Sequence, residues 1–295
     1  MRLLDAVHGA RQDEWMATSR RLSNLAILAV LACAAVYVVA LGTRWGLRLD
    51  KGALPRDVSG PRWERAHAAL HVAVESVSIA TMALVGAAAI LYALRRGRRD
   101  LALAAAGILV GANVTTSVLK PLLALADPLG GESERIVSGA YPSGHATATM
   151  SLALVTVLAA PRIWRLWVAF IASSYVAVVG VGLVALVAHQ PSDVVGGFLV
   201  AVAWAAGIAS VAASARERAA LHPRLRERLV ELGSWGGGCA VAAAVVLALL
   251  EPAVHFHHGL FAVAALIIAG LALVLPVALA VVLGGRPAAP LEPKS

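Results

Sequence analysis

The chain has 295 residues, of which 60% are hydrophobic and only 14% are charged, and its formal net charge is +8. Soluble domains carry about 25% charged residues, so this composition excludes an ordinary soluble globular protein. A positive net charge alone would also fit a nucleic-acid-binding protein, but the basic residues here lie in short clusters between apolar runs, as in membrane proteins. We therefore expect an integral membrane protein that contacts membrane lipids and binds no nucleic acid.

Apolar runs of bilayer-spanning length predict an all-α fold, a polytopic membrane helical bundle with about eight spans. In chain order the runs lie at about 23–43, 67–94, 101–125, 144–160, 163–188, 192–213, 234–250 and 259–284. The first run is longer than the 7–15-residue apolar core of a secretion signal, so we expect it to remain in the membrane.

The expected spans fall into two groups that a basic segment separates. Residues 23–213 are predicted to form a six-helix core, and residues 232–285 a two-helix transmembrane extension. A cytoplasmic segment, 1–22, precedes the core, and a basic cytoplasmic linker, 214–231, joins the two groups. The Pro-rich tail, 286–295, is predicted to be disordered.

Basic residues assign each loop to one side of the membrane, because they are enriched in cytoplasmic loops. The second loop contains the cluster Arg95–Arg99, and further basic residues lie in the N-terminal segment, the fourth loop and the linker. The first loop, 44–66, carries six basic residues, but placing it inside would put the Arg95–Arg99 cluster outside. We therefore expect a multi-pass protein of the cell membrane with both termini in the cytoplasm and the third and fifth loops on the extracytoplasmic side.

The fifth loop leads into the sequence His189-Gln190-Pro191-Ser192-Asp193. His189 and Asp193 are four residues apart, so on a helix they lie on one face, and Pro191 suits a first helical turn. A carboxylate that binds one imidazole nitrogen selects the tautomer and leaves the other nitrogen available as nucleophile or base. Alone, this spacing is common and only weakly indicates catalysis.

The third loop leads into Pro142-Ser143-Gly144-His145. Ser143 is a good N-cap for the following span, and Gly144 lets a ligand approach the backbone closely. The N–H groups of a helix start favour an anion such as phosphate, and His145 could donate a proton to a leaving oxygen. Alone, the stretch is more simply interpreted as a capped helix with an interfacial histidine.

Lys120 lies near the outer end of the expected third span. Its side chain either extends to the membrane interface or provides a fixed cation for phosphate oxygens. Lys120, the Ser-Gly-His stretch and the His-Asp pair then occur at three span ends on one membrane face. Together they suit phosphoryl transfer through a phosphohistidine, in which one histidine attacks and the other protonates the leaving group. We expect no metal and no cofactor.

These residues resemble the type 2 phosphatidic acid phosphatase (PAP2) superfamily over about residues 23–213. Its motifs are Lys-x6-Arg-Pro, Pro-Ser-Gly-His and Ser-Arg-x5-His-x3-Asp, and the second is complete at residues 142–145. The resemblance implies a six-helix core whose site lies at the outer membrane face in many bacterial members. It also implies that His189 is the nucleophile, Asp193 its orienting carboxylate and His145 the general acid. Lys120, Ser143 and the Gly144 N–H would bind the phosphate.

Both arginines of the family motifs are replaced in this chain. Asp127 stands in the first motif and Leu183 in the third. An arginine offers phosphate a bidentate fork that neither residue supplies, and loss of one oxyanion donor costs about 2.7–4 kcal/mol. Arg135, which lies in the same loop as Asp127, is a candidate substitute cation for binding the substrate phosphate.

Three functions remain open at this point. The first is a phosphatase acting on a (poly)prenyl or glycerolipid phosphate or diphosphate. The second is a lipid head-group phosphotransferase with an alcohol acceptor, similar to the sphingomyelin-synthase type. The third is a non-catalytic relative that binds or transports a lipid phosphate. The retained histidines favour an enzyme, whereas the missing arginines favour the second and third functions over a simple phosphatase.

Polar and small residues inside the spans have expected packing roles. Glu75 is expected to pair with His71, one helical turn away, or with Lys120. The third span carries residues suited to interhelical hydrogen bonds and to close helix packing, namely Asn113, Thr115, Thr116 and Ser117 for the first role and Gly107 and Gly111 for the second.

Overall fold

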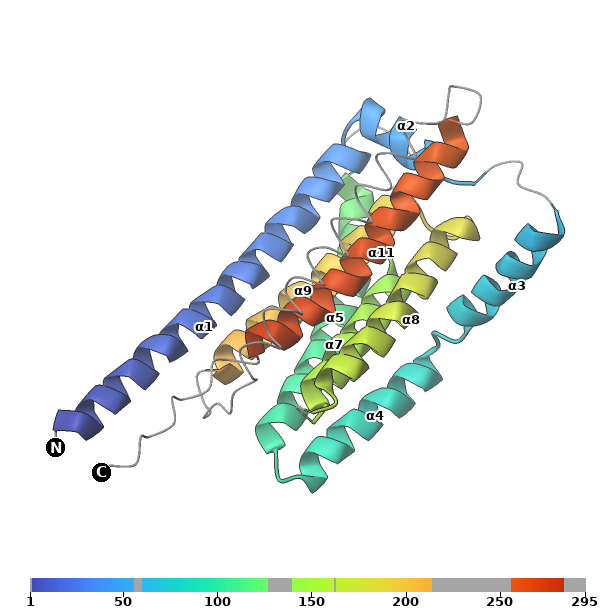
Figure 1. The fold of residues 1–295 in the computed structure, drawn as a ribbon. Coiled ribbons are helices and arrows are strands. Elements are labelled where there is room, and N and C mark those ends of the chain that lie inside the picture. Colours follow the sequence, from blue (N-terminus) through green and yellow to red (C-terminus); the bar gives the residue numbers. More distant parts are fainter. Residues whose placement is uncertain (1, 56–59, 127–139, 162, 214–255, 284–295) are drawn as a thin grey trace.

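The computed structural model describes residues 2–55, 60–126, 140–161, 163–213 and 256–283, and the structural statements below refer to them. These residues form helices and contain no strand, which confirms the predicted all-α bundle (Figure 1). In chain order the helices are α1 (Arg2–Val36), the π-helix η1 (Tyr37–Leu41), α2 (Arg44–Gly52), α3 (Pro61–Glu75), α4 (Ile79–Arg95), α5 (Arg99–Ala126), α7 (Gly144–Ala159), α8 (Arg165–Ala185), α9 (Pro191–Ala213) and α11 (Phe256–Leu283).

Five helical stretches are long and apolar enough to cross a membrane, which supports the prediction of a multi-pass protein. They are Ser19–Leu41, Arg99–Leu125, Arg165–Ala185, Pro191–Val211 and Gly259–Ala280, and they correspond to the predicted first, third, fifth, sixth and eighth spans. The predicted fourth span is the shorter helix α7, which has 16 residues. The predicted seventh span, 234–250, the linker and the tail lie outside the described residues.

The predicted second span, over 67–94, is bent and is not one straight helix. The segment divides into α3 and α4, whose axes differ in direction by 60°. Serines cause the break, because serine side chains compete with the helix for backbone hydrogen bonds. The Ser76 hydroxyl donates to the Ala73 carbonyl over 2.6 Å, and Ser78 begins α4 as an N-cap whose side chain accepts the N–H of Thr81.

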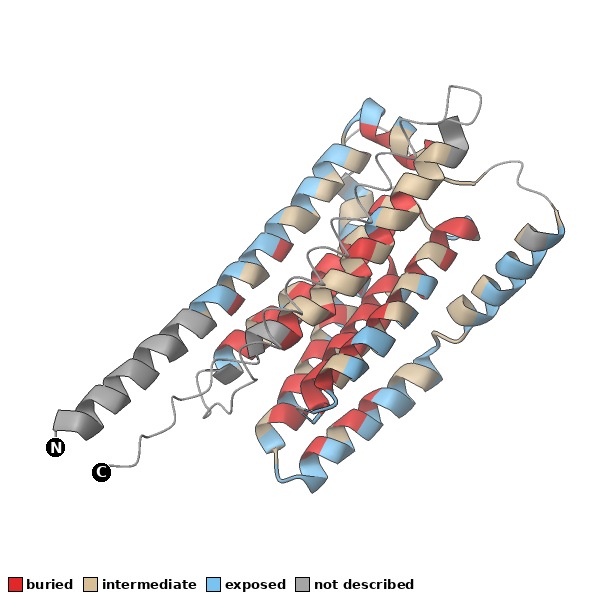
Figure 2. Ribbon diagram, in the orientation of Figure 1, coloured by how far each residue is buried: buried red, intermediate tan, exposed pale blue. Residues whose placement is uncertain are grey.

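Helices α7 and α9 form the centre of the bundle. Helix α9 packs against α1, α5, α7 and α11, while α8 packs against α7 and α11. Figure 2 shows that buried residues concentrate on these central helices, whereas α1, α3 and α4 expose one side. Helix α7 buries 12 of its 16 residues, which explains how so short an apolar helix is accommodated: protein surrounds it.

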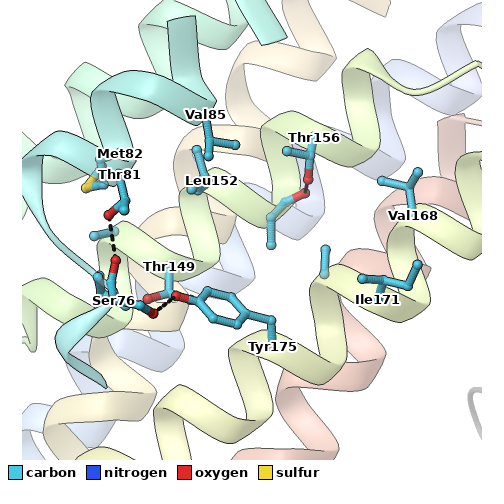
Figure 3. Close-up of a pocket in the computed structure, with 14 residues that line it drawn as sticks. Ser76, Thr81, Met82, Val85, Thr149, Leu152, Thr156, Val168, Ile171 and Tyr175 are labelled. Atoms are coloured by element: carbon cyan, nitrogen blue, oxygen red, sulfur yellow. Dashed lines mark hydrogen bonds between the residues drawn. The ribbon is translucent and has the colours of Figure 1, made fainter. Parts of the chain in front are cut away.

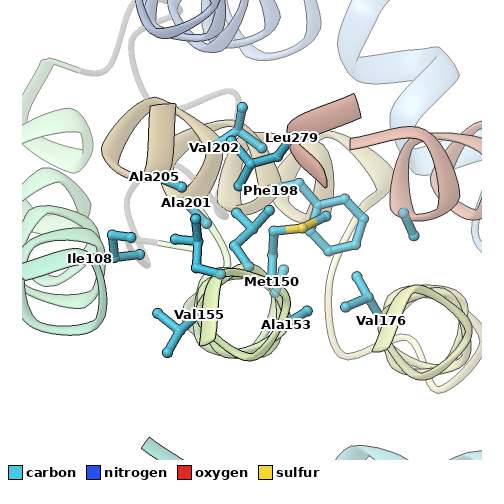
Figure 4. Close-up of a cluster of buried hydrophobic side chains, with 14 of the residues drawn as sticks. Ile108, Met150, Ala153, Val155, Val176, Phe198, Ala201, Val202, Ala205 and Leu279 are labelled. Carbon is cyan, nitrogen blue, oxygen red and sulfur yellow. The ribbon is translucent and has the colours of Figure 1, made fainter. Parts of the chain in front are cut away.

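The core between α7, α8 and α9 is a contact of apolar side chains. Met150 of α7 points toward Phe198 of α9, and both are completely buried (Figure 4). Lipid tails are as apolar as these side chains, so close van der Waals packing holds such helices together within a membrane. Gly180 of α8 permits this packing, because a Cβ there would lie 2.9 Å from the Phe198 ring.

Helix α5 makes close and hydrogen-bonded contact with its neighbours, as its composition predicted. A Cβ on Gly111 would lie 2.5 Å from the Trp204 ring, and a Cβ on Gly107 would lie 2.9 Å from Ile208, so both glycines allow α9 to approach. Interhelical hydrogen bonds link three of the predicted residues to α7 or α9: Thr116 to Thr147, Asn113 to Ser151, and Thr115 to Trp204. Ser117 instead bonds to its own helix.

Candidate active site

The start of α7 is built as its sequence predicts. Ser143 is completely buried and has an extended backbone conformation, and its side chain accepts the N–H of Ala146. Its carbonyl accepts hydrogen bonds from the N–H and the hydroxyl of Thr147. The next residues, Gly144 and His145, form the first turn of the helix, and His145 is exposed. The first turn therefore combines free N–H groups with an accessible imidazole.

The start of α9 holds the predicted histidine–aspartate pair. His189 Nδ1 lies 3.2 Å from Asp193 Oδ2, and the same oxygen accepts the Gln190 N–H over 3.0 Å. Asp193 is completely buried, while the His189 side chain is 13% exposed. In the tautomer that donates from Nδ1 to the carboxylate, Nε2 carries the lone pair and is the atom left for chemistry.

A direct backbone hydrogen bond joins the two helix starts. The Ser143 N–H donates to the Asp193 carbonyl over 2.9 Å. Gly197, one turn further along α9, makes this approach possible, because a Cβ there would lie 2.6 Å from the Ser143 oxygen and 2.9 Å from the Ala146 Cβ. Two segments that are about 50 residues apart in sequence thus form one polar cluster.

Lys120, in the C-terminal part of α5, lies beside this polar cluster. Its Nζ lies 3.7 Å from the position that a Cβ on Gly144 would occupy, so the ammonium group lies beside the first turn of α7. His145 is close enough to Lys120 and to His189 for both side chains to act on it electrostatically. Three helices therefore bring Lys120, Ser143, Gly144, His145, His189 and Asp193 together at one end of the bundle.

Comparison with protein families identifies this arrangement. Residues 101–217 match the model of the PAP2 superfamily, a range that contains all six of these residues. The match supports membership of the PAP2 superfamily for this part of the chain. Membership supports phosphatase-type chemistry on lipid phosphates in general. No curated protein and no solved structure matches the chain.

The position that carries the arginine of the third PAP2 motif is part of the core in this chain. Leu183 of α8 is 1% exposed, and its carbonyl accepts the N–H groups of Ala188 and His189, each over 3.0 Å. Leu183 therefore holds the backbone that leads to His189 but contributes no cation. The other PAP2 departure, Asp127, and the candidate substitute cation, Arg135, lie outside the described residues.

The turn between α8 and His189 contains a strained residue. Val187 has φ 56°, in the left-handed region that is unfavourable for a β-branched side chain. The N–H of Val187 donates to the Val184 carbonyl, and the N–H of Ala188 donates to the Leu183 carbonyl. This is the Schellman arrangement, in which glycine normally occupies the left-handed position. The chain thus maintains a strained turn two residues before His189.

The sequence analysis missed two residues that shape the site. Tyr141 precedes the Pro-Ser-Gly-His motif, and its hydroxyl donates to the Cys33 carbonyl of α1 over 2.7 Å. Burial raises the pKa of the Tyr141 hydroxyl well above its ordinary value, so it remains a donor. Asp50 of α2 is 7% exposed and accepts hydrogen bonds from Ser192 in α9. Local spacing indicates neither contact, because each partner is more than 100 residues distant.

Proposed function

We propose that the protein is a PAP2-type phosphatase that hydrolyses a lipid phosphate or diphosphate through a phosphorylated His189. One observation carries the proposal: three parts of the chain bring together an imidazole bound to a buried carboxylate, a helix start with a second imidazole, and a lysine beside that helix start. Nucleophile, proton donor and phosphate-binding groups are the parts that this reaction needs.

In the first step His189 Nε2 attacks phosphorus, and the P–O bond to the lipid breaks. His145, protonated, gives its proton to the leaving oxygen, so the lipid leaves as an alcohol, or as a monophosphate if the substrate is a diphosphate. Lys120 and the N–H groups at the start of α7 stabilise the charge on the phosphoryl oxygens. Asp193 stabilises the positive charge that develops on the His189 ring.

In the second step the P–N bond to His189 breaks. His145, now neutral, takes a proton from a water molecule, and the resulting hydroxide attacks phosphorus. Inorganic phosphate leaves, and both histidines return to their starting states. An alcohol that replaces this water would make the same site a phosphotransferase, which is the alternative function to be tested.

An apolar pocket beside the site supports a substrate with a hydrocarbon chain. The pocket has a volume of about 440 Å³, which lies in the range of ligand pockets, and it lies between α4, α7 and α8 (Figure 3). It begins near Thr149, one turn along α7 from His145, and continues toward Thr156. At its polar end the hydroxyls of Ser76 and Tyr175 hydrogen-bond over 2.6 Å. Because His145 and Thr149 are one helical turn apart, a phosphate at His145 would place an attached chain near this end of the pocket.

The orientation of α5 supports a site on the extracytoplasmic side of the cell membrane. The helix begins at Arg99, within the Arg95–Arg99 cluster, and Lys120 lies 21 residues later. At about 1.5 Å per residue, this separation is roughly 30 Å, the thickness of a bilayer core. Because basic clusters favour the cytoplasm, Lys120 and the other site residues are expected at the opposite face.

The deciding experiment offers the purified protein a panel of prenyl phosphates, prenyl diphosphates and phosphatidic acid, and measures free phosphate and new lipid products. We expect phosphate release that His189→Ala abolishes. His71→Ala is the matched control, because His71 is an exposed histidine that pairs with Glu75 on α3. New lipid without free phosphate would indicate the phosphotransferase, and binding without turnover would indicate the non-catalytic relative.

A further inference from the structure

Residues 33–50, which include the end of α1, all of η1 and most of α2, lie outside the range that matches the PAP2 model. This 33–50 segment nevertheless contacts the neighbourhood of every motif. The Tyr37 hydroxyl donates to the carbonyl of Leu123, three residues after Lys120. The Cys33 carbonyl accepts the hydroxyl of Tyr141, directly before Pro142. The Asp50 carboxylate accepts the N–H and the hydroxyl of Ser192, directly before Asp193. In Figure 1, α2 lies at the end of the bundle where α9 begins.

The contact with Ser192 is a helix cap provided by a distant residue. Ser192 is the second residue of α9, and its N–H lacks a partner within the helix, as for every helix start. Asp50 Oδ1 accepts this N–H over 3.0 Å, and Oδ2 accepts the Ser192 hydroxyl. Asp50 and Ser192 are 7% and 5% exposed, so water cannot easily replace either bond.

We propose that Asp50 is a positioning residue for the His189–Asp193 pair. The proposal rests on the function proposed above. His189 lies in the turn before α9, so its orientation depends on where the first turn of α9 is held. The Ser143–Asp193 backbone bond holds that turn against α7, and the Asp50–Ser192 bonds hold it against α2. Without Asp50, the turn is anchored by these bonds on one side only.

The first test compares Asp50→Ala, Asp50→Asn and Ser192→Ala. Asp50→Ala removes both acceptors and should lower kcat on the order of 100-fold, the scale expected for a misplaced catalytic group, while KM changes little. Asparagine can accept the Ser192 N–H and donate to its hydroxyl, so Asp50→Asn should restore most of the activity. Ser192→Ala removes one bond and should have an intermediate effect. This order would identify geometry, rather than charge, as the contribution of Asp50.

Asp100→Asn is the matched control, because Asp100 is also an acidic residue in a first helical turn, that of α5. It lies at the end of α5 opposite Lys120, so this variant should retain the wild-type kcat even if it is less stable. A kcat in Asp50→Ala that equals that of Asp100→Asn would contradict the proposal.

A second test does not require turnover. Nitrogen-15 NMR of histidine-labelled protein distinguishes the two imidazole tautomers, and the His189 signals can be assigned by their loss in His189→Gln. The wild type should show one His189 tautomer, Asp50→Ala a mixture, and Asp50→Asn again one. An unchanged His189 signal in Asp50→Ala would overturn the proposal. If the wild type turns over no lipid but the His189 tautomer changes in Asp50→Ala, the proposed function fails and the positioning role of Asp50 stands.

Discussion

Gly197 offers the sharpest test of how the site is assembled, through the substitution Gly197→Ala. A Cβ at this position would lie 2.6 Å from the Ser143 carbonyl oxygen, 2.9 Å from the Ala146 Cβ and 3.0 Å from the Thr147 nitrogen. Two of these atoms belong to the backbone and the third is fixed to it, so no side chain can rotate away. The starts of α7 and α9 must therefore separate.

The separation can be estimated from ordinary contact distances. A Cβ is normally at least 3.4 Å from a neighbouring atom, so relief of the 2.6 Å contact needs a shift of about 0.8 Å. Applied to the Ser143–Asp193 hydrogen bond of 2.9 Å, this shift gives about 3.7 Å, beyond hydrogen-bond range. Overpacking typically costs about 1–3 kcal/mol, and a misplacement of ~1 Å can lower catalytic rate on the order of 100-fold.

The assay combines thermal unfolding in detergent with phosphate release from a lipid phosphate. Gly207→Ala is the control, because it lies on the same helix and the nearest atom to its new Cβ is 4.0 Å away. Gly207→Ala should leave activity unchanged and raise stability by up to about 1 kcal/mol, since alanine favours a helix over glycine. If Gly197→Ala matched Gly207→Ala in both stability and activity, the close contact of α7 and α9 would not be what holds the site together.

Three further predictions concern the turn, the cation and the pocket. Val187→Gly should stabilise the protein by about 1 kcal/mol in thermal unfolding, because glycine adopts a φ of 56° without strain; an unchanged or lower melting temperature would contradict this. Lys120→Ala should lower kcat for phosphate release roughly 100- to 1,000-fold, with partial recovery in Lys120→Arg, if the ammonium group stabilises the phosphoryl oxygens. Ala172→Phe should fill part of the pocket between α4, α7 and α8 and raise KM for long-chain but not short-chain phosphates; equal effects on both would separate the pocket from substrate binding.

Local spacing was sufficient to predict much of the site. His189 and Asp193 are four residues apart and begin a helix, so their contact follows from helical geometry. Ser143 caps α7 because a serine before a helical run satisfies a free N–H. The resemblance to the PAP2 superfamily predicted from these motifs is supported by the family match over residues 101–217.

Other features depend on partners that no local pattern identifies. The break between α3 and α4 was not predicted, because the run 67–94 is apolar enough to span a membrane. The hydrogen bonds of the Ser76, Ser78 and Thr81 hydroxyl groups outweigh the tendency of this run to form one helix. The structure shows that the Leu183 side chain is buried in the core, whereas the sequence shows only that an arginine is missing at this position.

The sequence by itself indicated a membrane protein, located most of its spans and selected the candidate site residues that the structure brings together. These depend on apolar run length and on contacts within a single helical turn, which are both local properties of the chain. The tertiary structure alone decided that Lys120 lies beside Gly144, that Ser143 bonds to Asp193 and that Asp50 caps α9. Such contacts form only when helices pack, because each needs a small residue or a buried acceptor contributed by a distant segment.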